Sequence, residues 1–198
     1  MNLRIGLPLL MLAGLACFRA TEPGAPGRGT DERVVQDFVA GFGRRPARAL
    51  LRLFAEDATV SIEGLHIELR GAEEIRQFAE YGSAVGSRMS AFELSRRGAA
   101  VLAQIREENE WFKLLGVPEA FYRGRFTVAR GRIASAVLDL EPDSRDALAG
   151  RLASFVIWLS ANDPEAMGRL MPGGRLKPDA AAFREALALL QRWRSGSR

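Results

Sequence analysis

A series of predicted strands in the middle of the chain limits the fold more than any other feature. Four segments, 88–95, 99–111, 121–129 and 132–140, read as strands, and the second alternates apolar and polar residues along most of its length. A two-residue turn at 130–131 joins the last two as a hairpin. Strands connected this closely form a largely antiparallel sheet, and its apolar face needs helices to cover it.

Helices are predicted before these strands. Thr30 and Asp31 are good caps for a helix with an apolar face that ends near Gly41 to Gly43, and Gly82 is expected to end a later helix. The other predicted elements of this part are a short helix from Pro46 to Phe54, strands 58–62 and 65–69, and a helix over 72–81. The order predicts an α+β fold, with the helices packed on one face of the sheet.

The carboxyl-terminal part is predicted to be helical. One helix is capped by Asp143 or Ser144, a short one begins at Pro164, and Asp179 caps the last. Their apolar stripes pack on the sheet or on each other, close over a pocket, or form a homodimer contact. The predicted division of the chain is a signal peptide over 1–16, a flexible tether over 17–30, an α+β domain over 31–142 and a helical extension over 143–198.

The amino terminus has the order of a secretion signal. Met1 to Arg4 gives a short positive start, and Ile5 to Leu15 is an apolar stretch well below the roughly 20 residues that a membrane-spanning helix needs. The following Ala16-Cys17 resembles the end of a bacterial lipobox, although Gly14 stands where such motifs prefer Leu. We therefore expect a protein of the bacterial cell envelope, either lipid-anchored to a membrane through Cys17 or secreted after simple signal cleavage.

Composition excludes several classes of function. Cys17 is the single cysteine, so no disulfide forms within the domain and a C-x-x-C redox or zinc site is excluded. No phosphate-binding loop or metal-binding motif occurs, which predicts no cofactor and no metal. The net charge is +4, and its arginines are scattered along the chain, so a nucleic-acid partner is not expected.

Three motifs in order carry a resemblance to a known family. They are Leu53-Phe54-Ala55-Glu56-Asp57-Ala58, the string from Arg70 to Phe78 after a strand pair, and Gly131-Arg132-Ile133. Together they resemble the nuclear transport factor 2-like superfamily, which includes the SnoaL-like and ketosteroid-isomerase-like proteins, over about residues 31–142. The resemblance implies a cone in which a strongly curved sheet wraps around the helices. The apolar cavity of such a cone serves as an enzyme site, a ligand site or simply a core.

The strand over 99–111 predicts a polar group inside this cone. Its apolar residues occupy every second position up to Ile105, and successive side chains of a strand point to opposite faces. Glu107, Asn109 and Trp111 therefore continue the apolar face. A carboxylate and an amide are expected at one end of an apolar surface.

The hairpin adds further candidates. Counting in steps of two from the pair Val128 and Ile133 puts Tyr122 and Asp139 at the same end of the inward face. His66, the only imidazole of the chain, lies on the second strand. The predicted catalytic residues are Glu107, Tyr122 and Asp139, and the predicted ligand-binding residues are Asn109, Trp111, His66 and Phe126.

Two functions fit these residues. The first is a non-catalytic module that binds a small apolar ligand or a protein partner in the cone. The second is an isomerase, cyclase or dehydratase in which an inward carboxylate of raised pKa acts as general acid and base beside a tyrosine. A buried Glu107 without an arginine partner favours the enzyme, whereas a cavity filled by Trp111 and Phe155 favours a structural role.

Overall fold

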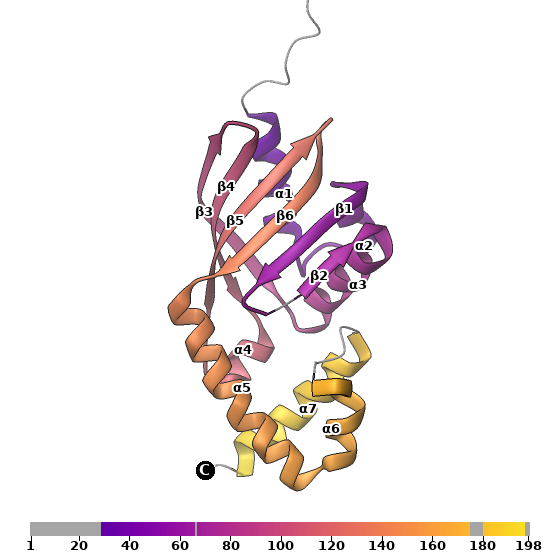
Figure 1. Ribbon diagram of the computed structural model, residues 1–198, viewed down its shortest axis with the longest axis vertical. Helices are drawn as coiled ribbons and strands as arrows, with labels where there is room; N and C mark the ends of the chain where they lie inside the picture. Colours follow the sequence, from indigo (N-terminus) through magenta and orange to yellow (C-terminus); the bar gives the residue numbers. More distant parts are fainter. Residues whose placement is uncertain (1–28, 66, 175–179, 197–198) are drawn as a thin grey trace, which may run out of the picture.

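The computed structural model describes residues 29–65, 67–174 and 180–196 (Figure 1). The elements are α1 (Thr30–Gly41), α2 (Ala47–Leu51), β1 (Phe54–Glu63), β2 (Ile67–Arg70), α3 (Gly71–Ala84), β3 (Arg88–Arg97), β4 (Ala100–Glu108), α4 (Glu110–Leu115), β5 (Ala120–Ala129), β6 (Arg132–Leu140), α5 (Pro142–Asn162), α6 (Pro164–Leu170), the 3-10 turn Pro172–Gly174 and α7 (Ala180–Gly196). The predicted signal peptide, most of the tether, Cys17 and His66 lie outside the described residues. Within the described ranges, no helix is both long and apolar enough to cross a membrane.

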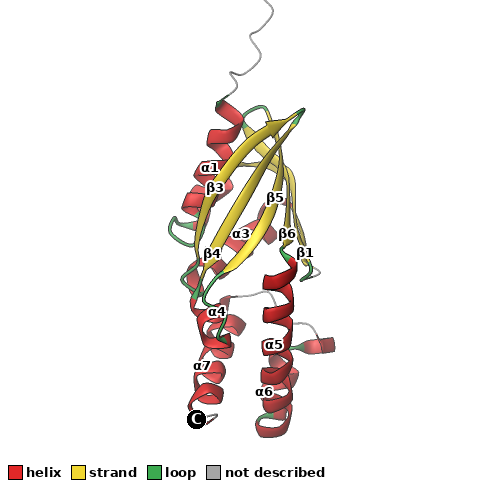
Figure 2. Cartoon of the chain, turned by 90° about the vertical axis from the view of Figure 1, so that its left-hand side faces the viewer, coloured by secondary structure: helices red, strands yellow, loops and turns green. Residues whose placement is uncertain are grey.

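One curved sheet of six strands forms the wall of a cone. Its order is β2-β1-β6-β5-β4-β3, and every neighbouring pair is antiparallel except β1 with β6. Helices α1 and α3 cover one face of it (Figure 2). The rings of Phe42, Phe54 and Phe126 surround Phe38 of α1, with centroids 5.2 to 6.0 Å from its own. The predicted α+β cone, with its sheet wrapped around the amino-terminal helices, is confirmed.

The hairpin between β5 and β6 contains an irregularity that the sequence did not predict. The turn is formed by Arg130 and Gly131, which both have positive φ angles (53° and 72°), as a two-residue hairpin turn requires. Beyond it the pairing shifts, because Val128 pairs with Ile133 but Thr127 pairs with Ser135. The extra residue in β6 is a β-bulge, and it moves every later side chain of that strand to the other face.

The bounds of several predicted elements differ in the structure. The second helix is only Ala47–Leu51, with Phe54 already in β1, and α1 and α5 begin after Gly29 and Glu141 and not at the predicted caps. Two further differences have a clear local cause. The strand expected over 99–111 ends at Glu108, because Asn109 begins α4: its Oδ1 accepts a hydrogen bond from the backbone N–H of Phe112 at 2.7 Å. Helix α3 does not end at Gly82 but runs through it to Ala84. Gly82 serves close packing, since a Cβ atom there would lie 2.7 Å from the ring of Phe42.

The carboxyl-terminal helices pack on the end of the cone away from the start of α1 (Figures 1 and 2). Helix α7 contacts α3, α4 and α5, and α5 also contacts α4 and β5. The contacts are aromatic at their centre, where Trp111 meets Phe155 and Phe183 with centroids 6.2 and 5.7 Å away. The predicted helical extension is therefore a cap that buries the aromatic residues of α4.

Candidate functional site

A buried carboxyl group lies at the capped end of the cone. Glu107 is the last inward-facing residue of β4, and its side chain is only 4% exposed. Its Oε1 accepts hydrogen bonds from Ser87 Oγ at 2.5 Å and from Asn109 Nδ2 at 2.9 Å. Its Oε2 accepts one from the hydroxyl of Tyr122 at 2.9 Å. Three neutral donors thus converge on one carboxyl group.

Each donor is held by a different element. Ser87 directly precedes β3, which pairs antiparallel with β4, so its hydroxyl lies across from the end of β4. Tyr122 faces inward from β5, where it pairs with Ile105, one inward position before Glu107. Asn109 uses both ends of its amide, because Nδ2 donates to Glu107 while Oδ1 caps α4. The network therefore fixes the junction of β3, β4, β5 and α4.

Burial, with no cationic partner among the described residues, sets the protonation state of the Glu107 carboxyl group. Among the described residues, no arginine or lysine forms an ion pair or hydrogen bond with Glu107. Burial raises the pKa of Glu107, and the hydrogen bonds from Ser87, Asn109 and Tyr122 oppose that rise without cancelling it. The pKa values of the Tyr81 and Tyr122 hydroxyls are also raised, by burial and then by the negative charge of Glu107. This carboxyl keeps its proton to a higher pH than an exposed glutamate.

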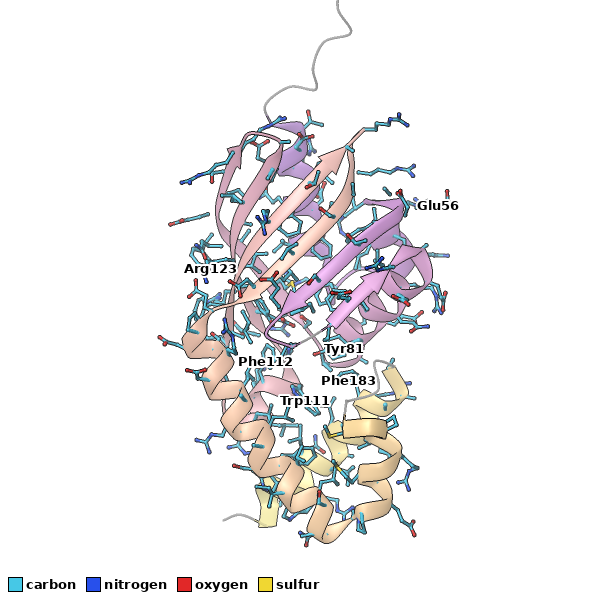
Figure 3. The ribbon with its side chains drawn as sticks, viewed as in Figure 1. Glu56, Tyr81, Trp111, Phe112, Arg123 and Phe183 are labelled. Carbon is cyan, nitrogen blue, oxygen red and sulfur yellow. The ribbon has the colours of Figure 1, made fainter. Side chains whose placement is uncertain are left out.

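Aromatic side chains close the site. The ring of Tyr81 on α3 packs on that of Phe183 on α7 at 4.1 Å, and Phe183 also meets Trp111. Figure 3 shows these residues together at the junction of the cone and the carboxyl-terminal helices. Trp111 is 6% exposed. Helix α7 packs on α3 and α4 over this end of the cone.

The predicted position of Asp139 is wrong. The β-bulge puts Leu138 and Leu140 on the inward face, so Asp139 points outward. There its carboxylate forms ion pairs with Arg123 at 2.9 Å and with Arg145 at 3.5 Å. The correct register gives Tyr122 the partner Leu140, and Asp139 has no part in the Glu107 site.

The other predicted positions have mixed outcomes. The inward placements of Glu107, Asn109 and Tyr122 are confirmed, while their functional roles stay predictions. Trp111 is buried, but it lies on α4 against the carboxyl-terminal helices and not on a strand of the cone. Phe126 is fully buried against Phe38, two inward positions along β5 from Tyr122, so it lies in the aromatic core and not beside the carboxyl group.

Sequence reasoning missed Ser87 and Tyr81. Ser87 lies in the short link between α3 and β3, where a single serine gives no pattern. Tyr81 does carry a signal, because it follows Phe78 by one helical turn on the apolar side of α3. No group of three or more potential metal ligands occurs within the described ranges.

The comparisons place this architecture among cone-shaped proteins with a curved sheet and enclosed helices. Neither a protein-family model nor a curated protein matches the sequence. Similar solved structures exist, and one of them is described as having a ketosteroid isomerase-like fold.

Three of these structures illustrate the likeness. An epoxide hydrolase from M. tuberculosis is 17% identical with a TM-score of 0.52, over 67% of this chain and 98% of its own. A protein with a ketosteroid isomerase-like fold from Catenulispora acidiphila, in complex with trimethylamine, is 20% identical with a TM-score of 0.50, over 59% and 92%. A de novo designed protein with a curved β-sheet is 13% identical with a TM-score of 0.50, over 65% and 99%. The likeness shows the fold alone.

Proposed function

We propose that this protein binds a small, largely apolar molecule at the capped end of the cone, with the carboxyl group of Glu107 as the polar anchor. The observation that carries the proposal is the buried Glu107, which three neutral donors hold at the closed mouth of an apolar core. The ligand that suits this site is mostly hydrocarbon and has one hydrogen-bonding group. That group would meet Glu107 and Tyr122, and the rest would lie among the surrounding rings.

A purely structural role explains the network poorly. Replacing a buried ionic network by apolar residues of similar size is often neutral or stabilises a protein by about 1–4 kcal/mol. A core needs no ionisable group at this position, and the remainder of the cone is filled by phenylalanine and aliphatic residues. Buried ionisable groups with perturbed pKa values cluster at functional sites. The trimethylamine in the Catenulispora acidiphila structure is a precedent for a small ligand in this fold.

Access in this proposal depends on α7. Phe183 packs on both Tyr81 and Trp111, so displacement of α7 opens a path between α3 and α4. The ligand would replace the aromatic contacts that Phe183 makes. Binding would then shift the population of an open state and not require a permanent channel.

The test is native mass spectrometry of the protein purified from its own envelope fraction, followed by binding of a lipid and metabolite extract. We expect a retained small molecule in the wild-type protein and in Glu93→Gln. We expect its loss, or binding weakened by about tenfold, in Glu107→Gln, because an amide replaces the anchoring carboxyl group. Glu93 is the matched control, since it is an exposed glutamate of β3 that takes no part in the Glu107 network. No retained molecule and no binding from the extract would contradict the proposal.

A second function is favoured by the raised pKa of Glu107. A carboxyl group that exchanges its proton at a higher pH than usual is suited to take a proton from a carbon next to a carbonyl and return it to another position. This is the chemistry of an isomerase or cyclase, with Tyr122 as a hydrogen-bonding partner. If the retained molecule contains a carbonyl group, we expect its neighbouring protons to exchange in D₂O with wild type but not with Glu107→Gln, as NMR would detect.

The proposal includes export and anchoring. A signal peptide over 1–16 and lipid modification at Cys17 would hold the domain at the cell envelope through the tether. Growth with an alkyne-tagged fatty acid tests this. We expect labelling of the wild-type protein and none of Cys17→Ser, and an unlabelled secreted protein would show simple cleavage instead.

A further inference from the structure

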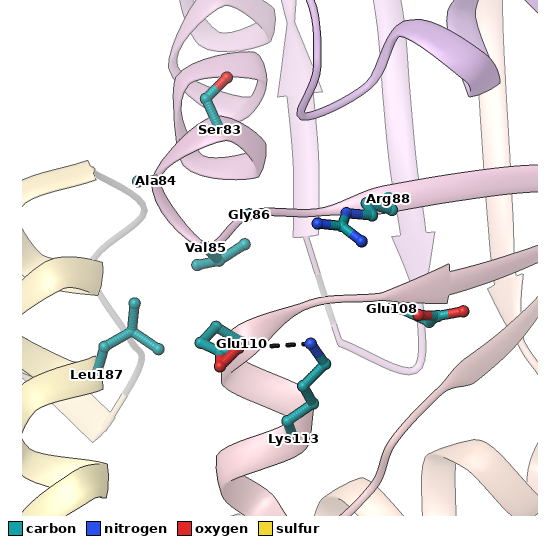
Figure 4. Close-up of a pocket in the computed structure, with 9 residues that line it drawn as sticks. All are labelled: Ser83, Ala84, Val85, Gly86, Arg88, Glu108, Glu110, Lys113 and Leu187. Carbon is teal, nitrogen blue, oxygen red and sulfur yellow. Dashed lines mark ion pairs between the residues drawn. The ribbon is translucent and has the colours of Figure 1, made fainter.

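A pocket lies beside the junction of the cone and its cap, and it is separate from the Glu107 site. It has a volume of about 350 Å³ and lies between the end of α3, the starts of β3 and α4, and α7. Its lining is Ser83, Ala84, Val85, Gly86, Arg88, Glu108, Glu110, Lys113 and Leu187 (Figure 4). The volume is within the range of small-molecule sites.

The pocket is on the opposite side of the strand ends from Glu107. Gly86 and Arg88 flank Ser87, and Glu108 follows Glu107, so neighbours in sequence serve two different sites. Adjacent side chains on a strand point to opposite faces, and for this reason Ser87 and Glu107 face the core while Arg88 and Glu108 face the pocket. A molecule in the pocket would not touch the Glu107 carboxyl group.

Pairing of the charged side chains leaves one positive charge in the pocket. Lys113 forms an ion pair with Glu110 at 3.6 Å, and Glu108 pairs with Arg106 at 3.5 Å. Arg88 lies opposite Glu108 in the β3–β4 register, but no ion pair or hydrogen bond joins the Arg88 side chain to any described residue. Figure 4 shows its guanidinium group directed toward Gly86, along the pocket. The group available to a ligand is therefore a cation.

The other end of the pocket is apolar. Leu187 of α7, Ala84 and Val85 form this end, away from the guanidinium group (Figure 4). Leu187 lies one helical turn after Phe183, so one face of α7 contacts both the pocket and the aromatic closure of the Glu107 site. A ligand that touches Leu187 and Arg88 together would join α7 to the cone.

We propose that this pocket binds a small organic anion with a short hydrocarbon chain, such as a medium-chain carboxylate. Its carboxylate pairs with the guanidinium of Arg88, which can form two parallel hydrogen bonds with it. Its chain lies on Ala84, Val85 and Leu187. Because the ligand contacts both α7 and the cone, it stabilises the seated position of α7 and with it the closure at Phe183.

The test is a binding titration of the purified full-length protein with hexanoate, followed by NMR or calorimetry. Hexylammonium reverses the charge of the probe, and acetate removes its chain. We expect hexanoate to bind more tightly than either, and Arg88→Gln to weaken it by about tenfold or more, because a charge-assisted hydrogen bond is lost. Arg97→Gln is the matched control, since Arg97 is an exposed arginine at the other end of β3, away from the pocket.

A second readout separates this pocket from the Glu107 site. Glu107→Gln should bind hexanoate as wild type does, and hexanoate should slow hydrogen exchange in α7 by a factor that grows with its occupancy. Equal binding of hexylammonium, an unchanged affinity in Arg88→Gln, or no binding of hexanoate would overturn the inference. None of these outcomes depends on whether Glu107 binds a ligand.

Discussion

The raised pKa of Glu107 predicts that this one carboxyl group makes the stability of the protein depend on pH. The perturbation is Glu107→Gln, which removes the titration but keeps the size and the hydrogen-bonding capacity of the side chain. The hydroxyls of Ser87 and Tyr122 can each donate or accept, so an amide can satisfy the same partners. We expect the variant to fold.

The direction of the pKa shift of Glu107 determines whether the protein becomes more or less stable as pH rises. Above the unfolded value of about 4.5, the unfolded chain has lost the proton that the folded protein still holds on Glu107. The free energy of unfolding therefore decreases as pH rises from that value to the higher folded pKa, and stays at its lower level above it. The titration of one carboxyl group changes the free energy of unfolding by at most about 1.4 kcal/mol per pH unit.

The assay is urea unfolding followed by tryptophan fluorescence at a series of pH values, from about 4 to about 8. We expect the stability of Glu107→Gln relative to wild type to increase with pH through this window. Glu93→Gln, at an exposed position of β3, is the matched control for the loss of one carboxylate. Parallel curves for wild type and Glu107→Gln would mean that Glu107 titrates as an exposed group does, and the reasoning about its burial would fail.

Three further predictions concern the same region. Tyr122→Phe removes the donor to Glu107 Oε2 and should cost about 1.5–3 kcal/mol at high pH and less at low pH, as urea unfolding at the two pH values will measure. Gly82→Ala should destabilise the protein by about 1–3 kcal/mol, because the new Cβ would lie 2.7 Å from the Phe42 ring. Gly168→Ala has open space around it and should stabilise α6 by up to about 1 kcal/mol. Thermal unfolding measures both. Phe183→Ala should increase hydrogen exchange in α7 and in the first turn of α4 without unfolding the sheet.

The sequence predicted the fold well where the local pattern is regular. The alternation along β4 placed Glu107 and Asn109 on the core side because β4 pairs with β5 without interruption over its whole length. The turn at 130–131 and the helices that precede and follow the sheet in the sequence were likewise encoded by short-range signals. The face of a sheet on which a residue lies can be predicted from the sequence as long as the strand is uninterrupted.

The failures arose where one residue changes a register or ends an element. The bulge in β6 adds a residue after Ile133, and no composition signal marks it, so the predicted position of Asp139 was wrong by one step. Helix α4 was hidden because Asn109 continues the alternation of β4 and also caps a helix. A capping asparagine, a hexapeptide with four apolar residues (Glu110–Leu115) and a following glycine form a signal that could have revealed it, and Gly116 does adopt the left-handed conformation of a helix end.

Two observations favour different functions for the site. A buried Glu107 without a cation among its described partners favours an enzyme, while Trp111 packed against Phe155 favours a structural role. The aromatic filling comes from α4, α5 and α7, whereas the carboxyl group and its donors come from β4, β5, Asn109 and the start of β3. If α7 moved away, Phe183 would leave with it, while the polar network would stay because it is built on the sheet and on Asn109. If α7 stays closed on the timescale of hours in hydrogen exchange, the network is a structural junction; if it opens, Glu107 becomes the anchor of a site that the cap controls.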